Sequence, residues 1–233
     1  MKTYQRIGYI LITVSVLIFS FLIFIPYIVE SKQAYIISSH HLSAQQLHKE
    51  QKNRMLVQCR QYNQTLASDH TITLLSQSQL NEYINLLNLD GNGMMAEISI
   101  PSIRITLPVY HGTDDTTLQN GAGHCEWSDL PTGELNTHTV FTAHSGLSTA
   151  RMFTDLPSMK IGDTFSITVL NREITYTIIS VLQTDPDDLS WYTRNPGSSL
   201  CTLITCVPLG INNRRLCVTA KRIKPSVNTE VFH

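Results

Sequence analysis

The first pattern along the chain is an uninterrupted apolar run. The 23 positions from Ile7 to Val29 carry no charge and are rich in Ile, Leu, Val and Phe. A helix rises about 1.5 Å per residue, so this run exceeds the roughly 30 Å hydrocarbon core of a bilayer and predicts a transmembrane helix over residues 7–29. It is longer than the apolar core of a secretory signal peptide, and no small-x-small cleavage site follows it.

The charges beside this run predict its orientation. Lys2 and Arg6 precede it together with the α-amine, whereas Glu30 and Lys32 follow it. Basic residues flanking a membrane helix tend to stay in the cytoplasm. We therefore expect residues 1–6 to form a cytoplasmic tip, with the rest of the chain outside a cell membrane that it crosses once.

The polar region 30–90 has a helical pattern. It contains neither Pro nor Gly, and long stretches without these helix breakers favour helix. We expect a helical stalk from about Ser31 to Leu66 and a second helix over Gln77–Leu87. Three histidines of the stalk have helical spacing, and we interpret them as part of a solvated face rather than as a metal site. They are His40, His41 and His48.

The pattern changes over residues 91–224, where Gly and Pro separate short stretches of alternating apolar and polar residues. Such stretches predict β-strands, with Pro101 and Pro108 at strand ends. Asn171-Arg172 is short enough for a hairpin turn, and a short helix is expected over Ser148–Leu156. About seven strands predict a mainly β domain, either a closed barrel or a sandwich, followed by a tail at 225–233. The expected strands are Met94–Ile100, Ile103–Leu107, His138–Ala143, Thr164–Leu170, Glu173–Leu182, Leu200–Cys206 and Arg214–Arg222.

The composition narrows the possible functions. A formal net charge of -1 gives no support to a nucleic-acid partner. The charged share of 15% is below the roughly 25% of typical soluble domains. Five cysteines are an odd number without CxxC or any Cys/His metal spacing. We therefore expect no zinc, no other metal and no cofactor, and at least one free thiol.

Three residue types that support nucleophilic chemistry stand at the ends of predicted strands. Cys206 ends an apolar strand just before a turn, His144 follows the strand that ends at Thr142, and Arg214-Arg215 open the last strand. A cysteine is nucleophilic as the thiolate, which a neighbouring imidazolium or guanidinium stabilises. Arginine cannot act as a base and suits a carbonyl or oxyanion instead. Adjacent strand residues point to opposite faces of the sheet, so only one of the two arginines faces Cys206. The sequence pattern alone does not show which of the two it is.

A cysteine in an apolar strand is more often a small buried hydrophobe than a nucleophile. That interpretation is preferred for four of the five thiols and stays an alternative for Cys206. Because Cys217 shares strand parity with Arg215, we expect it near the site. The four thiols are Cys59, Cys125, Cys201 and Cys217.

Several segments resemble motifs of the sortase family, and the chain from about Gly93 to Ile223 resembles the class C, pilus-assembling sortases. The strand that ends at Cys206 is similar to the TLxTC signature. The other similar segments, in chain order, are Ile100-Pro101-Ser102-Ile103, Leu107-Pro108-Val109-Tyr110-His111-Gly112, Gly121-Ala122-Gly123-His124, Ser128-Asp129-Leu130-Pro131, Ala143-His144-Ser145-Gly146-Leu147, Ala150–Leu156, and Gly210-Ile211-Asn212 with Arg215-Leu216.

This resemblance implies a closed β-barrel of seven or eight strands and a transpeptidase. Cys206 is then the nucleophile, His144 the general acid and base, and Arg215 rather than Arg214 the carbonyl-orienting group. The implied partners are proteins with an LPxTG-like sorting signal, such as pilins. The signal is cleaved through a thioacyl enzyme and passed to an amine, a pilin lysine or a cell-wall precursor. His124 is expected to be structural, and His111 has no chemical role.

The sequence departs from the class C pattern in three places. The family lid carries an Asp-Pro-aromatic tripeptide, whereas this chain reads Ser68-Asp69-His70-Thr71. Asp69 and His70 are thus weak lid candidates, and we expect an open site. No second membrane helix follows Ile223, so the anchor is expected at the N-terminal end. Ala143, Ser145 and Leu209 also replace the usual Gly, Arg and Tyr beside the site.

Two other functions compete with the transpeptidase. A surface cysteine peptidase would let water resolve the same intermediate, but peptidases of the Cys-His kind rarely use an arginine as third member. A non-catalytic surface β-barrel for adhesion would need no Cys206, His144 and Arg215 together. Products formed from a sorting peptide and an excess amine would separate the three.

Overall fold

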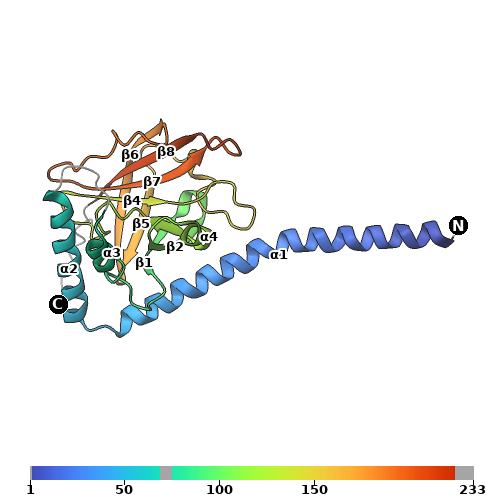
Figure 1. Ribbon diagram of the computed structural model, residues 1–233, viewed down its shortest axis with the longest axis horizontal. Coiled ribbons are helices and arrows are strands. Elements are labelled where there is room, and N and C mark those ends of the chain that lie inside the picture. The colour runs from blue at the N-terminus through green and yellow to red at the C-terminus, as the bar shows by residue number, and fades with distance from the viewer. Residues whose placement is uncertain (1, 69–74, 224–233) are drawn as a thin grey trace, which may run out of the picture.

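The structure is a computed structural model that describes residues 2–68 and 75–223 (Figure 1). Within these residues three helices precede a β-barrel: α1 (Lys2–Gln46), α2 (Lys49–Ser68) and α3 (Gln77–Tyr83). The barrel strands are β1 (Met94–Ile100), β2 (Ile105–His111), β3 (Ala122–His124), β4 (Thr137–Thr142), β5 (Thr164–Val169), β6 (Arg172–Thr184), β7 (Ser199–Val207) and β8 (Arg214–Arg222). Between them lie α4 (Asp115–Asn120) and two 3-10 helices, η1 (Pro101–Ile103) and η2 (Leu156–Ser158).

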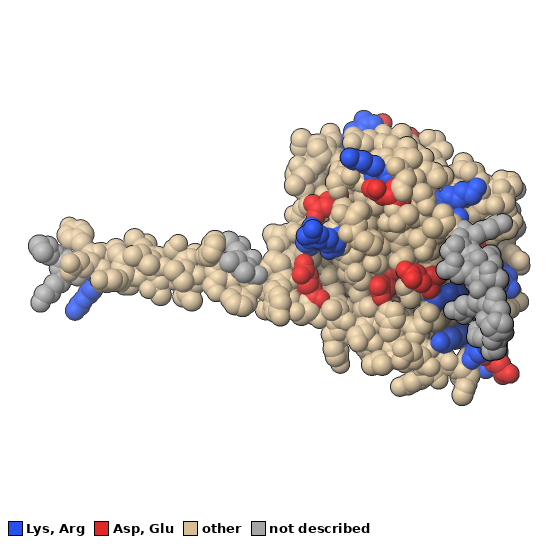
Figure 2. Space-filling view, turned by 180° about the vertical axis from the view of Figure 1, so that it is seen from behind, with Lys and Arg blue, Asp and Glu red and all other residues tan. Residues whose placement is uncertain are grey.

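Helix α1 contains the whole apolar run and continues into the polar region. It is long and apolar enough to cross a membrane, and its apolar part projects away from the barrel (Figure 1). Figure 2 shows a nearly uncharged surface along this part of the helix. The apolar side chains of this run are therefore not buried against the barrel.

The predicted stalk is two helices rather than one. Helix α1 ends at Gln46, and α2 starts at Lys49 on a new axis beside the barrel (Figure 1). The side-chain oxygen Oε1 of Gln51 accepts a hydrogen bond from the backbone N–H of His48 at 2.8 Å, which caps the start of α2. A glutamine can cap the start of a helix without any Pro or Gly nearby. The boundary between α1 and α2 was therefore missed, because the sequence analysis looked for these two residues.

The eight strands close into a barrel in the order β1-β2-β3-β4-β7-β8-β6-β5, with β5 pairing back to β1. Most neighbours are antiparallel, but β2 with β3 and β4 with β7 run parallel. This closed barrel confirms the fold that the resemblance implied. Closure leaves the described sheet without an unpaired edge.

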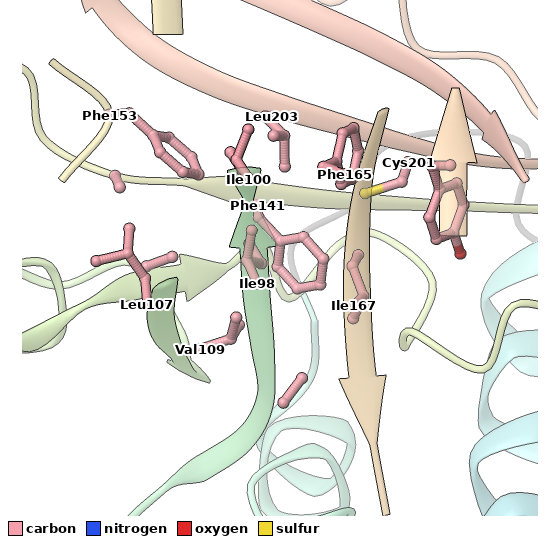
Figure 3. Close-up of a cluster of buried hydrophobic side chains, with 14 of the residues drawn as sticks. Ile98, Ile100, Leu107, Val109, Phe141, Phe153, Phe165, Ile167, Cys201 and Leu203 are labelled. Carbon is pink, nitrogen blue, oxygen red and sulfur yellow. The ribbon is translucent and has the colours of Figure 1, made fainter. Parts of the chain in front are cut away.

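The barrel interior is filled by apolar side chains from all around the sheet. Figure 3 shows Phe141 of β4 and Leu203 of β7 among inward-pointing residues of β1, β2 and β5. Because strand residues alternate between faces, their neighbours Val140 and Ile204 point to the outer face. These two are also buried, since Trp127, Trp191 and Tyr192 cover them. Strand β7 is therefore apolar on both faces, which explains its continuous hydrophobic run.

Several local expectations were wrong, and helix α3 ends at Tyr83 rather than at Leu87. Segment Ser148–Leu156 forms turns rather than a helix, and Met152 has a left-handed φ of 41°, which a helix cannot contain. Strand β2 begins at Ile105 rather than Ile103 and passes through Pro108 to His111. Proline is tolerated there because pairing with β3 begins only at Val109, which leaves that side of β2 open at Pro108.

The hairpin between β5 and β6 forms one residue earlier than expected. Its turn residues are Leu170 and Asn171, with φ of 51° and 61°. Two consecutive positive φ values are typical of the type I′ turn, which matches the twist of the flanking strands. The elements α4 and β3 were not predicted, because each is six residues or shorter and carries little periodic signal.

Candidate active site

Cys206 and Arg215 are cross-strand partners. The register of β7 and β8 pairs Cys206 with Arg215 and Val207 with Arg214. Directly opposed residues of an antiparallel pair point to the same face, with Cβ atoms about 4.5–5.5 Å apart. Both side chains are half-buried on the outer face of the barrel. Arg214 lies on the other face of the strand and forms an ion pair with Asp185 at 3.2 Å.

His144 is brought to the same end of the barrel by the parallel pair β4 and β7. The ladder pairs Thr142 with Ile204. It then continues past β4, because the N–H of Ala143 donates to the Ile204 carbonyl at 3.2 Å and Thr205 Oγ1 donates to the Ala143 carbonyl at 2.8 Å. His144 therefore follows Thr142 by the same two positions by which Cys206 follows Ile204.

The loop that carries His144 is held by its own backbone contacts. The N–H of Phe153 donates to the His144 carbonyl at 3.0 Å, and the N–H of Gly146 donates to Thr154 Oγ1 at 3.0 Å. Gly146 has a φ of +76°, and a Cβ there would lie 2.4 Å from Cδ1 of Leu209. The β7–β8 turn, which contains Leu209, thus packs directly on the His144 loop.

Most of the Arg215 guanidinium is available for a ligand. Its Nη1 donates to the carbonyls of Asn212 and Arg214, both at 3.3 Å. Within the described residues its remaining N–H groups make no hydrogen bond or ion pair. Because Arg215 is the cross-strand partner of Cys206, these donors are available for the carbonyl oxygen of a substrate at that thiol.

Cys206 is the one partly exposed thiol of the five, and the other four are buried as expected. Burial raises the pKa of the Cys59 and Cys217 thiols to about 12 and raises the pKa of Cys125 and Cys201 as well. These four thiols stay protonated near neutral pH and cannot act as nucleophiles. Cys217 pairs with Ile204, and it is the next residue after Arg215 on β8 that points to the outer face, as the strand alternation predicted.

His124 and His111 have structural partners. Burial lowers the pKa of His124 to about 3, and its Nδ1 and Nε2 atoms lie 2.9 Å from the Tyr83 hydroxyl and the Asp129 carbonyl. Both ring nitrogens of His111 lie 2.8 Å from backbone carbonyls, those of Gly93 and Leu86. These contacts tie α3 to the barrel and leave neither ring open to substrate.

Two buried or half-buried residues on the outer face of the barrel were not identified by the sequence analysis. His138 is buried on the outer face of β4, where Nδ1 donates to the Thr193 carbonyl and Nε2 accepts from Thr202 Oγ1, both at 2.7 Å. Arg194 binds Asp129 with two hydrogen bonds, at 2.8 and 3.1 Å. Both contacts fasten the segment between β6 and β7 over the outer face.

The weak lid candidates Asp69 and His70 lie outside the described residues. Among residues 2–68 and 75–223 no group of three His, Cys, Asp or Glu side chains is arranged to hold a metal ion.

A sequence model of the Sortase domain matches residues 98–223. The chain belongs to the sortase family. Among solved structures this sortase is similar to sortase C1 from Streptococcus agalactiae, with a TM-score of 0.79 and 32% identity over 82% of this chain and 100% of that chain. It is also similar to Sortase C from Streptococcus pneumoniae, with a TM-score of 0.73 and 34% identity over 82% and 97% of the two chains.

A curated relative is Sortase A from Streptococcus agalactiae serotype III (strain NEM316). It is 31% identical over 113 residues, which are 47% of this sortase and 45% of the relative. This sortase thus matches less than half the length of that relative. The family match and the similar sortase C structures support a sortase-type cysteine transpeptidase.

Proposed function

We propose that this sortase is anchored in the membrane by α1 and cleaves an LPxTG-like sorting signal through a thioacyl intermediate on Cys206. The observation that carries the proposal is the register of β7 and β8, which sets Cys206 opposite Arg215 on an accessible outer face. An amine then takes the acyl group. Because the similar solved structures include class C sortases, we assign a pilin lysine as acceptor and pilus assembly as the role.

In the first half-reaction the Cys206 thiolate attacks the carbonyl carbon of the Thr–Gly bond. The Arg215 guanidinium donates hydrogen bonds to the oxygen as negative charge develops on it. The C–N bond then breaks, and His144 gives its proton to the departing glycine amine. The product is a thioester between Cys206 and the threonine acyl group.

In the second half-reaction the incoming amine attacks the thioester carbonyl. His144 takes a proton from the amine, the C–S bond breaks, and the Cys206 thiolate is restored. Water in place of the amine would make the enzyme a peptidase, and no chemistry at all would leave a surface adhesion module. The guanidinium beside the thiol favours the transpeptidase over both.

The test is mass spectrometry of the enzyme with an LPxTG peptide, with and without excess amine. We expect a thioacyl adduct on the intact enzyme and an amide product when amine is present. Cys206→Ala should give neither, while Cys217→Ala, which removes a buried thiol of the same face, should keep both. Adduct formation by Cys206→Ala would disprove the assignment, and a carboxylic acid as the main product with amine present would favour the peptidase.

The membrane anchor is tested separately. The full chain should float with lipid vesicles through a density gradient after an alkaline wash, since a spanning helix resists extraction. The expected topology places residues 1–6 inside the cytoplasm and the barrel outside it. Recovery of the full chain in the soluble fraction would disprove anchoring by α1.

A further inference from the structure

A pocket of about 460 Å³ lies between α1 and the barrel. One wall is the segment of α1 from Glu30 to Ser38, and the other comes from β2 and from Arg104 and Arg151. Its volume is within the range of roughly 300–1,000 Å³ that small-molecule sites occupy. It is separate from Cys206, His144 and Arg215, none of which lines it.

The walls of this pocket are fixed relative to each other. Gln33 of α1 is 5% exposed, and its Nε2 donates to the carbonyl of Asn120 at 2.9 Å. Lys32 Nζ donates to Asn120 Oδ1 at 3.2 Å. Two contacts from one turn of α1 to the end of α4 hold the helix against the barrel. The pocket is therefore preformed and does not depend on a ligand.

The charged lining of the pocket is mainly basic. Arg104 and Arg151 line it together with one carboxylate, Glu30. Arg151 forms an exposed ion pair with Asp155 at 2.6 Å, a contact that contributes little and can rearrange. Within the described residues the Arg104 guanidinium has no hydrogen-bond or ion-pair partner. Figure 2 shows basic and acidic side chains side by side where the helix meets the body.

The backbone at the pocket is also unusual. Arg104 and Met152 both line it, and both have left-handed φ values, 54° and 41°. Non-glycine residues in this conformation are strained and are found more often than elsewhere at ligand sites. The pocket also has an apolar side, to which Ile37, Leu107 and Met152 contribute. A ligand that fits must therefore have both an anionic group and an apolar part.

The position of the pocket indicates where such a ligand comes from. The apolar run ends at Val29, and Glu30 at the pocket edge is the next residue. The headgroup layer of a bilayer is about 5–7 Å thick on each side, which corresponds to four or five helical residues. With the run in the bilayer, the near edge of the pocket lies in the headgroup layer.

We propose that this pocket binds the phosphate-bearing headgroup of a membrane glycerophospholipid. The phosphate lies between the guanidiniums of Arg104 and Arg151, which bind phosphate with paired hydrogen bonds. Glu30 accepts a hydrogen bond from a hydroxyl or ammonium group of the headgroup, and the apolar side contacts the start of an acyl chain. The inference rests on the proposed anchoring by α1 but not on the proposed transpeptidation.

The test is native mass spectrometry of the full chain in detergent micelles titrated with phosphatidylglycerol. We expect one retained lipid on the parent chain, and about tenfold weaker retention for each of Arg104→Gln and Arg151→Gln, as the loss of one charge-assisted contact implies. Arg54→Gln removes an exposed charge from α2 and should retain lipid like the parent. Phosphatidylcholine, whose headgroup has no hydrogen-bond donor for Glu30, should be retained less.

Equal lipid retention by all three variants would overturn the proposal. So would displacement of the lipid by soluble glycerol 3-phosphate at equal concentration, because the ligand would then be a free phosphate ester. The flotation assay distinguishes failure of the lipid site from failure of the membrane anchor. If anchoring fails, parent and variants all stay in the soluble fraction, whereas failure of the lipid site leaves all of them floating with vesicles.

Discussion

At the scale of single residues, two adjacent arginines show how the β-sheet decides which side chain can take part in chemistry. Arg215 lies opposite Cys206 and keeps free donors, whereas Arg214 faces the other way toward Asp185. Their side chains are identical, so the difference in role comes from strand parity alone.

This parity predicts unequal effects of the same substitution. Arg215→Lys keeps the charge but loses the planar fork of donors, so we expect kcat to fall by about 10²–10³. Arg214→Lys should leave kcat nearly unchanged. Steady-state kinetics with an LPxTG peptide and an amine measures both variants, and equal losses would contradict the assigned orientation.

The proposed catalytic residues could be picked out from the sequence, whereas the buried polar residues that fasten the outer face of the barrel could not. Cys206, His144 and Arg215 stand at the boundaries of strongly patterned strands, and motifs of a known family cover all three. His138 and Arg194 act through contacts with residues 55 and 65 positions away, to Thr193 and Asp129. No local pattern encodes such distant partners.

At the scale of elements, the His144 loop and the β7–β8 turn form one packed unit. Gly146 has a positive φ, and Leu209 occupies the space that a Cβ at Gly146 would need. The loop that holds His144 and the turn that follows Cys206 therefore meet through a glycine and a leucine. Their contact fixes how the two functional ends of the strands face each other.

Gly146→Ala should consequently damage activity. The left-handed backbone costs about 1–2 kcal/mol with a Cβ present, and Leu209 must also move, so we expect kcat to fall about tenfold. Adding Leu209→Ala should restore only part of the loss, because the backbone strain remains. Gly162→Ala is the control, since Gly162 has a φ of +95° but nothing within 4 Å of a new Cβ. A similar loss of kcat in that variant would show that backbone strain anywhere in the barrel suffices.

Elements were predictable from sequence where periodicity was strong. The last strand, Arg214–Arg222, was predicted to the residue, and most other strands to within one or two. The helix expected over Ser148–Leu156 failed because left-handed backbone at Met152 depends on packing, not on local propensity. The division of the stalk between α1 and α2 was missed because a glutamine cap marks it.

At the scale of the whole molecule, buried histidines make the stability of the fold depend on pH. Burial lowers the pKa of His124 to about 3 and that of His138 to about 4, from an ordinary 6.5. Below pH 6.5 the unfolded chain gains protons at these residues that the folded chain does not bind. Stability that is complete above pH 6.5 is therefore lost as the pH falls toward 4.

Each of these histidines should contribute a slope of about 1.4 kcal/mol per pH unit over that range. Replacing one with a neutral residue, as in His138→Gln, should lower the slope by that amount, even though the variant is less stable at pH 7. Denaturant titration at several pH values, followed by the fluorescence of Trp127 and Trp191, measures the slope. The exposed His48→Gln is the control and should match the parent, and parallel curves for parent and His138→Gln would disprove the assignment.

The parallel pairing of β4 with β7 also has a consequence for the timing of activity. Thr142 and Ile204 lie 62 positions apart, so the ladder between them forms only after most of the domain has been synthesised and folded. A chain that is still extended carries the Cys206 thiol with neither His144 nor Arg215 beside it. Such a thiol has ordinary reactivity toward peptides. In the proposed mechanism, completion of the barrel is therefore the step that brings His144 to Cys206.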